Sequence, residues 1–132
     1  MSPWNLRDLD HALRASWAAD TCSPDDRADW RPDNPAWGHC DITALVVHDV
    51  FGGLLLVGEV HLDGVQRGHH WWNRLCSGVE LDLTREQFRR GQTVGAPRAL
   101  ERPPGPLPRR WEDYLLLRSR VAAHLDPLPG PS

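Results

Sequence analysis

Cysteine is scarce in this chain of 132 residues: Cys22, Cys40 and Cys76 are the three present, and they lie far apart. An odd, widely spaced set excludes the disulfide framework on which small secreted domains depend. No signal peptide opens the sequence, and free thiols are the norm in a reducing compartment. The sequence therefore predicts a cytoplasmic protein with three free cysteines.

Long apolar runs and an excess of basic charge are also lacking. The longest runs, such as ALVV and LLLV, are far too short to cross a bilayer. With 15 Lys and Arg against 18 Asp and Glu, the net charge is -3, which argues against a nucleic-acid or anionic-membrane surface. A P-loop and a dinucleotide fingerprint are absent. We expect a small-molecule or peptide substrate as the partner, and the oligomeric state stays open.

Phenylalanine and tyrosine are rare, with two and one copies, whereas seven tryptophans are present. Tryptophan buries a large apolar area and keeps one polar N–H group. This composition indicates either a Trp-rich core or a Trp-lined cleft, and the sequence leaves both open.

The hydrophobic pattern predicts one α+β domain over residues 1–125, followed by a disordered tail at 126–132. A helix over 3–17, capped by Ser2, presents an apolar stripe, and residues 18–36 form a long loop. A second helix from about Gly38 to Val50 is apolar on most faces, as expected of a central buried helix, and Gly52 and Gly53 end it.

An antiparallel meander is predicted to follow this buried helix, with strands at 54–62, 65–75 and 79–83. Asp63-Gly64 is a strong two-residue hairpin signal between the first two strands. Thr84 to Gln87 has the form of a capping box and predicts a short helix. Residues 90–108 are predicted to be loop, and WEDYLLLRSRVAAHL a last helix with an inner face of apolar residues: Trp111, Tyr114, Leu115, Val121, Ala122 and Leu125. We thus expect the buried helix to pack on a small antiparallel sheet, with the terminal helices alongside; a half-closed or closed barrel is the alternative.

The register between the second and third strands decides which side chains meet. If the turn is Cys76 to Gly78, Leu75 lies opposite Val79 and Trp72 opposite Asp82. His70, Trp72, Asp82 and Thr84 then share one sheet face, with Asp82 a diagonal neighbour of His70. A slip of one residue would move Asp82 to the other face.

Cys40 is predicted to stand at the start of the buried helix, where exposed N–H groups and the helix dipole favour the thiolate. With this register, Cys40 would be the nucleophile, His70 the base, and Asp82 the group that orients the imidazole. Backbone N–H groups at the helix start would stabilise an oxyanion. The predicted function is a cysteine-dependent hydrolase or acyl/amide transferase.

Four segments of the chain resemble signature segments of the YunG-like family of small bacterial proteins: SWAADTCSPDDRADW, NPAWGHCDITALVVHD, HWWNRL and ELDLTREQF. The resemblance runs from about Ser16 to Phe88. Family members usually carry Gln before the cysteine, a residue type that could donate to an oxyanion, where this chain has His39. The order of Cys helix, His strand and Asp strand is also similar to papain-like and NlpC-type thiol enzymes, at the level of fold analogy alone.

Several residues near this constellation are candidates for ligand binding: Trp37, His39, Trp72 and Asn73. Strand alternation sends His69 and His70 to opposite faces. The resemblance favours His70, because the family's HxWN segment aligns with His70, Trp72 and Asn73.

Simpler interpretations compete with catalysis. Cys40 could be a small buried hydrophobe, and Asp82 could cap the following turn or pair with Arg85. The same Trp-lined cleft could bind a ligand or peptide without turnover. A metal site is a further alternative, although no Cys or His pair has a recognised zinc spacing; we predict no metal and no cofactor.

Overall fold

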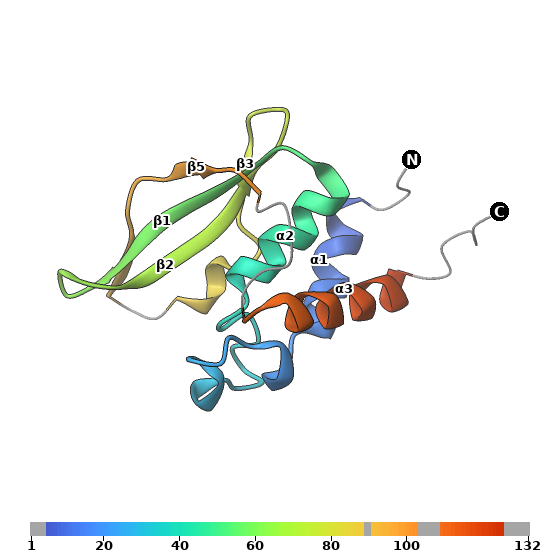
Figure 1. The fold of residues 1–132 in the computed structure, drawn as a ribbon, viewed down its shortest axis with the longest axis horizontal. Helices are drawn as coiled ribbons and strands as arrows, with labels where there is room; N and C mark the ends of the chain where they lie inside the picture. The colour runs from blue at the N-terminus through green and yellow to red at the C-terminus, as the bar shows by residue number, and fades with distance from the viewer. Residues whose placement is uncertain (1–4, 89–90, 103–108, 126–132) are drawn as a thin grey trace.

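The computed structural model describes residues 5–88, 91–102 and 109–125, and within these ranges it has the α+β architecture that the sequence predicts. Its elements in chain order are α1 (Leu6–Ser16), η1 (Ala19–Thr21), η2 (Arg27–Asp29), α2 (Cys40–Phe51), β1 (Leu54–Leu62), β2 (Val65–Arg74), β3 (Glu80–Leu81), η3 (Arg85–Gln87), β4 (Gln92–Val94), β5 (Arg98–Leu100) and α3 (Trp111–Leu125), where η marks a 3-10 helix. Figure 1 shows the strands on one side of the molecule and α1 and α3 on the other, with α2 between them. The predicted tail at 126–132 lies outside the described residues.

The sheet is antiparallel, with strands in the order β3-β2-β1-β4, and β5 pairs with the same strand β1 as β4 does. β4 pairs with Val60–Leu62 and β5 with Leu55–Val57, so the two short strands follow each other along β1. The prediction of a loop over 90–108 is wrong for these strands. Each has three residues, too few for a period of two to emerge from a segment rich in Gly and Pro.

The hairpin between β1 and β2 forms as predicted. Asp63 and Gly64 have φ angles of 53° and 79°, the pair of positive angles that a type I′ turn requires. β3 is shorter than predicted, because only Glu80 and Leu81 pair with β2. The backbone edge of β2 before Asn73 is therefore not covered by β3.

Helix α2 is the centre of the core. Its residues from Ile42 to Val47 are all buried, and Gly52, with φ 69°, ends it as predicted. The helix packs on β2 and against α3, and Asn73 of β2 donates a hydrogen bond from Nδ2 to the carbonyl oxygen of Ala44 at 3.0 Å. Helix and strand are thus tied together one turn beyond Cys40.

Helix α1 begins later than predicted. Asn5 caps it, since its Oδ1 accepts a hydrogen bond from the Asp8 N–H at 2.8 Å, and Ser2 lies outside the described residues. The predicted stripe is buried at Leu9, Leu13 and Trp17, whereas Leu6 is exposed at the helix start.

Helix α3 has the predicted bounds, but its inner face is different. Tyr114, Leu117 and Val121 are buried, whereas Leu115 is 41% exposed. The buried residues follow spacings of three and four, and Leu115 lies one position off that stripe. The capping box at Thr84 also does not form: the Thr84 side chain makes no capping bond to η3 and binds Asp82 instead.

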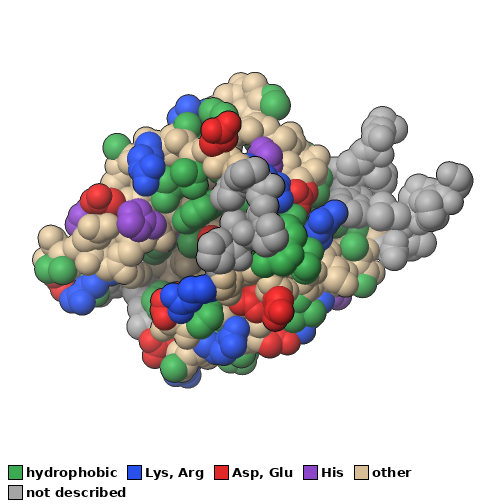
Figure 2. All heavy atoms as spheres, viewed as in Figure 1, with side chains coloured by type: hydrophobic (Ala, Val, Ile, Leu, Met, Phe, Trp, Pro, Cys, Tyr) green, Lys and Arg blue, Asp and Glu red, His purple; other side chains and the backbone are tan. Residues whose placement is uncertain are grey.

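The surface carries both signs of charge, and acidic and basic side chains are interspersed over the face in Figure 2. Among the described residues, no helix has the length and apolar character needed to cross a bilayer.

Candidate functional site

Cys40 is the first residue of α2, as the sequence predicts, and it opens onto a cavity of about 750 Å³. Opposite α2, the cavity wall includes His69, His70 and Trp71 of β2, and Gln87 and Phe88 close another side. Trp37 stands on the loop that leads to α2 and lines the same space. Cys40 and both candidate histidines therefore line one cavity.

The expected lowering of the Cys40 pKa is wrong. Although Cys40 as a residue is partly exposed, burial raises the pKa of its thiol to about 12, and the carboxylates of Asp41 and Asp82 add to the rise. A hydrogen bond from the Trp71 backbone N–H and the charge of Arg110 act in the opposite direction and are outweighed. At neutral pH the resting form is the thiol.

His70 and Asp82 lie together as the register predicted. Asn73 pairs with Leu81 and Arg74 with Glu80, which is the predicted alignment, and it brings His70 Nε2 to 2.6 Å from Asp82 Oδ2. The other carboxylate oxygen, Oδ1, accepts from the N–H and the hydroxyl of Thr84, both at 3.3 Å. Asp82 thus orients the His70 ring through one carboxylate oxygen and stabilises the turn at Thr84 through the other.

The His70 ring is held on its faces and edges as well as at its nitrogens. It is 2% exposed, stacks on Trp72 with centroids 5.5 Å apart, and meets Phe88 edge-on at 4.5 Å. Trp72 is itself anchored by a hydrogen bond from Nε1 to Glu80 Oε1 at 2.8 Å. These contacts hold the ring in the observed orientation.

No hydrogen bond joins Cys40 Sγ to a ring nitrogen of His70 in the part of the chain that the structure describes. His70 Nδ1 instead lies 3.4 Å from Nε2 of Gln87. His69 is exposed and lines the same cavity, but the carboxylate of Asp82 contacts His70. The structure therefore distinguishes the two imidazoles by their partners.

The predicted binding residues lie in different places. Trp37 lines the Cys40 cavity. Trp72 borders an adjoining hollow of about 570 Å³ that it shares with His70 and Asp82. Asn73 is buried and binds the α2 backbone, so its observed contact is one that supports the fold.

His39 is fully buried, and it is not among the residues that line the cavity. Nδ1 is 2.8 Å from the carbonyl oxygen of Trp37, and Nε2 is 2.7 Å from Thr21 Oγ1. Since a carbonyl only accepts, Nδ1 carries the hydrogen and Nε2 accepts from the Thr21 hydroxyl. Burial lowers the pKa of His39 to about 4, which keeps the ring neutral.

Acid is expected to destabilise the protein through His39. The folded-state pKa of about 4 is below the ordinary 6.5, so the unfolded chain binds a proton that the folded chain excludes. This contribution to stability is fully present above pH 6.5 and is lost as the pH falls towards 4, by about 3 kcal/mol in total. Urea unfolding at several pH values measures the loss.

The matched variant is His39→Gln, which keeps a donor and an acceptor but does not titrate. Its free energy of unfolding should vary by about 3 kcal/mol less over the same pH range. Equal pH dependence in both proteins would show that another group controls acid stability.

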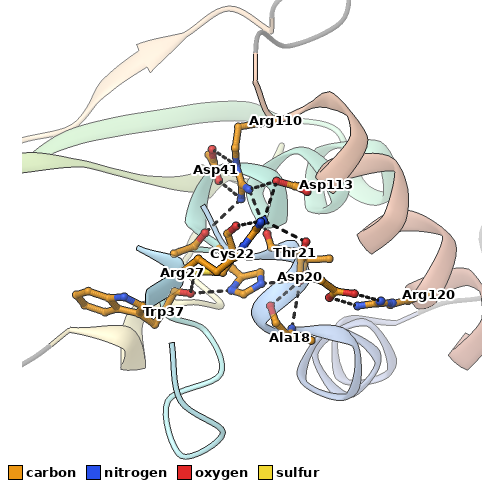
Figure 3. A network of polar contacts seen from close by, with 12 residues as sticks. Ala18, Asp20, Thr21, Cys22, Arg27, Trp37, Asp41, Arg110, Asp113 and Arg120 are labelled. Atoms are coloured by element: carbon orange, nitrogen blue, oxygen red, sulfur yellow. Dashed lines mark hydrogen bonds and ion pairs between the residues drawn. The ribbon is translucent and has the colours of Figure 1, made fainter. Parts of the chain in front are cut away.

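Arg110 is a residue that the sequence analysis missed. It is 8% exposed and binds Asp41 with two nitrogens, both at 3.1 Å, and Asp113 at 2.6 Å (Figure 3). It also donates to the carbonyl oxygens of Thr21 and Gly38. Burial alone would lower the pKa of Arg110, but Asp41 and Asp113 raise it above its ordinary value. This guanidinium joins the starts of α2 and α3 beside Cys40.

Gly38 permits the tight approach of the chain to α2. Its φ angle is +74°, and a Cβ there would collide with the sulfur of Cys22. Its carbonyl accepts from Ser23 N and Arg110, and its N–H donates to Gln87 Oε1 at 3.3 Å. Only glycine fits this position without strain.

No group of three or more His, Cys, Asp or Glu side chains is arranged to hold a metal ion, within the ranges that the structure describes.

A sequence model of the family described as "YunG protein" matches residues 5–126. A protein of Bacillus subtilis (strain 168) named "Uncharacterized protein YunG" is 31% identical over 83 residues, which is 63% of each chain. The matched segment thus covers less than two thirds of that relative. No solved structure matches the chain.

Proposed function

Because the chain belongs to the YunG family, whose name states no activity, we propose a function from the geometry of the cavity: cysteine-dependent hydrolysis or acyl/amide transfer on a small molecule or a modified side chain. One observation carries the proposal. Cys40 and His70 line the same cavity, and Nε2 of the His70 ring is 2.6 Å from the Asp82 carboxylate. A nucleophile and a base at one cavity, with an acid bound to the base, are the parts of a papain-like thiol site.

In the proposed reaction, the Cys40 sulfur attacks the carbonyl carbon of an amide or ester while its proton passes to His70 Nδ1. The imidazolium then gives that proton to the leaving amine or alcohol, and a thioester remains on Cys40. Water resolves the thioester in a hydrolase, and a second amine or alcohol resolves it in a transferase. Asp82 stabilises the imidazolium between the two proton transfers.

The raised pKa of Cys40 determines the kind of catalysis. A preformed thiolate–imidazolium pair does not fit a neutral thiol, so the proton must leave as the sulfur attacks. His70 then acts as a general base, and a hydrogen bond between the Cys40 thiol and His70 Nδ1 would have to form when substrate enters the cavity.

Acylation of Cys40 tests the proposal. The protein is incubated with p-nitrophenyl esters and with simple thioesters as generic acyl donors, and adducts are located by mass spectrometry. We expect one acyl group on Cys40, lost in Cys40→Ala and retained in Cys76→Ala, whose thiol stands exposed in a turn. Acylation confined to Cys76 would count against the proposal.

A binding module without turnover is the second candidate, and it is favoured because His70 Nδ1 lies against Gln87 Nε2 rather than in a hydrogen bond to Cys40. In that case no acyl donor modifies Cys40, and Cys40→Ala binds the same ligands as the unmodified protein. Fluorescence of Trp37, which lines the cavity, provides the binding measurement.

A further inference from the structure

Gln87 is a buried amide that the proposed reaction does not yet use. It ends η3 and is 6% exposed. Its backbone is fixed by two hydrogen bonds, from its N–H to the carbonyl oxygen of Thr84 at 3.0 Å and from Asn34 Nδ2 to its own carbonyl oxygen at 3.1 Å. The side chain therefore reaches the cavity from a rigid support.

Two contacts determine how the amide is oriented. One end lies 3.3 Å from the Gly38 N–H and the other 3.4 Å from His70 Nδ1. A backbone N–H can only donate, so the Gln87 oxygen must face Gly38 and the NH2 group must face His70. The reverse orientation would set two donors against each other at Gly38.

This orientation settles the tautomer of His70. Because the Gln87 NH2 group donates, Nδ1 accepts and the ring hydrogen is on Nε2, where Asp82 Oδ2 accepts it at 2.6 Å. The hydrogen bonds then run in one direction from the Gly38 N–H through Gln87 and His70 to Asp82. In the other tautomer, the Nδ1–H group would face the Gln87 NH2 group, which is donor against donor. The Nε2 lone pair would face the Asp82 carboxylate, which is acceptor against acceptor.

We infer that Gln87 is a positioning residue that helps to hold His70 in the Nε2–H tautomer, so that Nδ1 carries no hydrogen, as a base for Cys40 requires. The inference rests on the proposed function for its effect on catalysis, whereas the tautomer is a property of the resting protein. A separation of 3.4 Å is long for an N–H···N contact, so the amide restrains Nδ1 without binding it tightly. Nδ1 has one lone pair, so the Gln87 NH2 group must move off it before Nδ1 can take a proton from an incoming thiol.

The tautomer is measured by the 15N shifts of the His70 ring at neutral pH, assigned by their loss in His70→Asn. We expect the Nε2–H form in the unmodified protein. Gln87→Leu removes the donor at Nδ1 and leaves Asp82 alone to favour the Nε2–H form, so the population of the Nδ1–H tautomer should rise. Gln87→Glu still accepts from the Gly38 N–H but sets a carboxylate against Nδ1, so both ring nitrogens should carry hydrogen. Gln66→Leu, an exposed site on β2, is the matched control and should leave the signals unchanged.

The rate of Cys40 acylation is the second readout. It should fall at least about tenfold in Gln87→Glu, because Nδ1 then already carries a hydrogen and general-base assistance typically contributes 10²–10⁴-fold. If the tautomer changes while acylation does not, Gln87 positions His70 as inferred and the proposed function fails. If neither variant changes the ring signals, the inference is overturned whatever the acylation rate. Gln87→Glu keeps the hydrogen bond from the Gly38 N–H, so it tests the inference even if Gln87→Leu does not fold.

Discussion

Replacing Arg110 with leucine is expected to lower the free energy of unfolding by about 3–5 kcal/mol, because removal of one partner from a buried ion pair leaves uncompensated charge. Asp41 and Asp113 would both lose their closest cation. The carbonyl oxygens of Thr21 and Gly38 would also lose a donor. Urea unfolding at pH 7 measures the change.

Arg120→Leu is the matched control on the same helix. Arg120 also binds a carboxylate with two nitrogens, at 2.8 and 2.6 Å from Asp20, but this pair is exposed to solvent. Its removal should cost only about 0–1 kcal/mol. If both variants lose the same free energy of unfolding, the burial of the Arg110 ion pairs is not the reason that they stabilise the fold.

Replacing His70 with alanine is expected to slow acylation of Cys40 by about 10²–10⁴-fold, the contribution of a general base. The Cys40 pKa of about 12 makes the loss large, since few thiols ionise unaided at pH 7. Release of p-nitrophenol under single-turnover conditions measures the rate.

His69→Ala supplies the control, because His69 lines the same cavity and lies exposed on the opposite strand face. Its rate should stay within a factor of about two, as for other surface substitutions. Asp82→Asn extends the test. Its Oδ1 can still accept from Thr84, but its NH2 group would face Nε2 and force the hydrogen onto Nδ1. That variant should be slow like His70→Ala. Equal rates in the His69 and His70 variants would remove His70 from the reaction.

Much of the site could be predicted because its signals are local. The turn from Cys76 to Gly78 sets the register that brings Asp82 to His70, and that pairing is confirmed. The position of Cys40 at the first residue of α2 is confirmed as well. The low pKa expected for Cys40 is wrong, because burial raises it. How deeply a sulfur is buried depends on several elements that pack around it at once.

The features that the sequence did not predict depend on contacts between residues that lie far apart in the chain. Gln87 was interpreted as part of a capping box, yet its side chain turns inward to Gly38 and His70. Nothing in the sequence indicates that Arg110 is buried, because an arginine at a helix start is usually solvated. The tertiary structure alone shows that this one is enclosed. Strands β4 and β5 depend on β1 as a template, so their own residues do not predict them.

The amino-acid sequence alone determined the features that follow from short-range periodicity and turn chemistry. These are the central helix, the hairpin at Asp63-Gly64, the last helix and the strand register that places His70 and Asp82 on one sheet face. Tertiary structure alone decided the electrostatics around Cys40, since desolvation, the Arg110 ion pairs and the Gln87 amide arise only when separate segments pack together. Periodicity is a property of neighbouring residues, whereas the charge state of a thiol depends on everything that surrounds it.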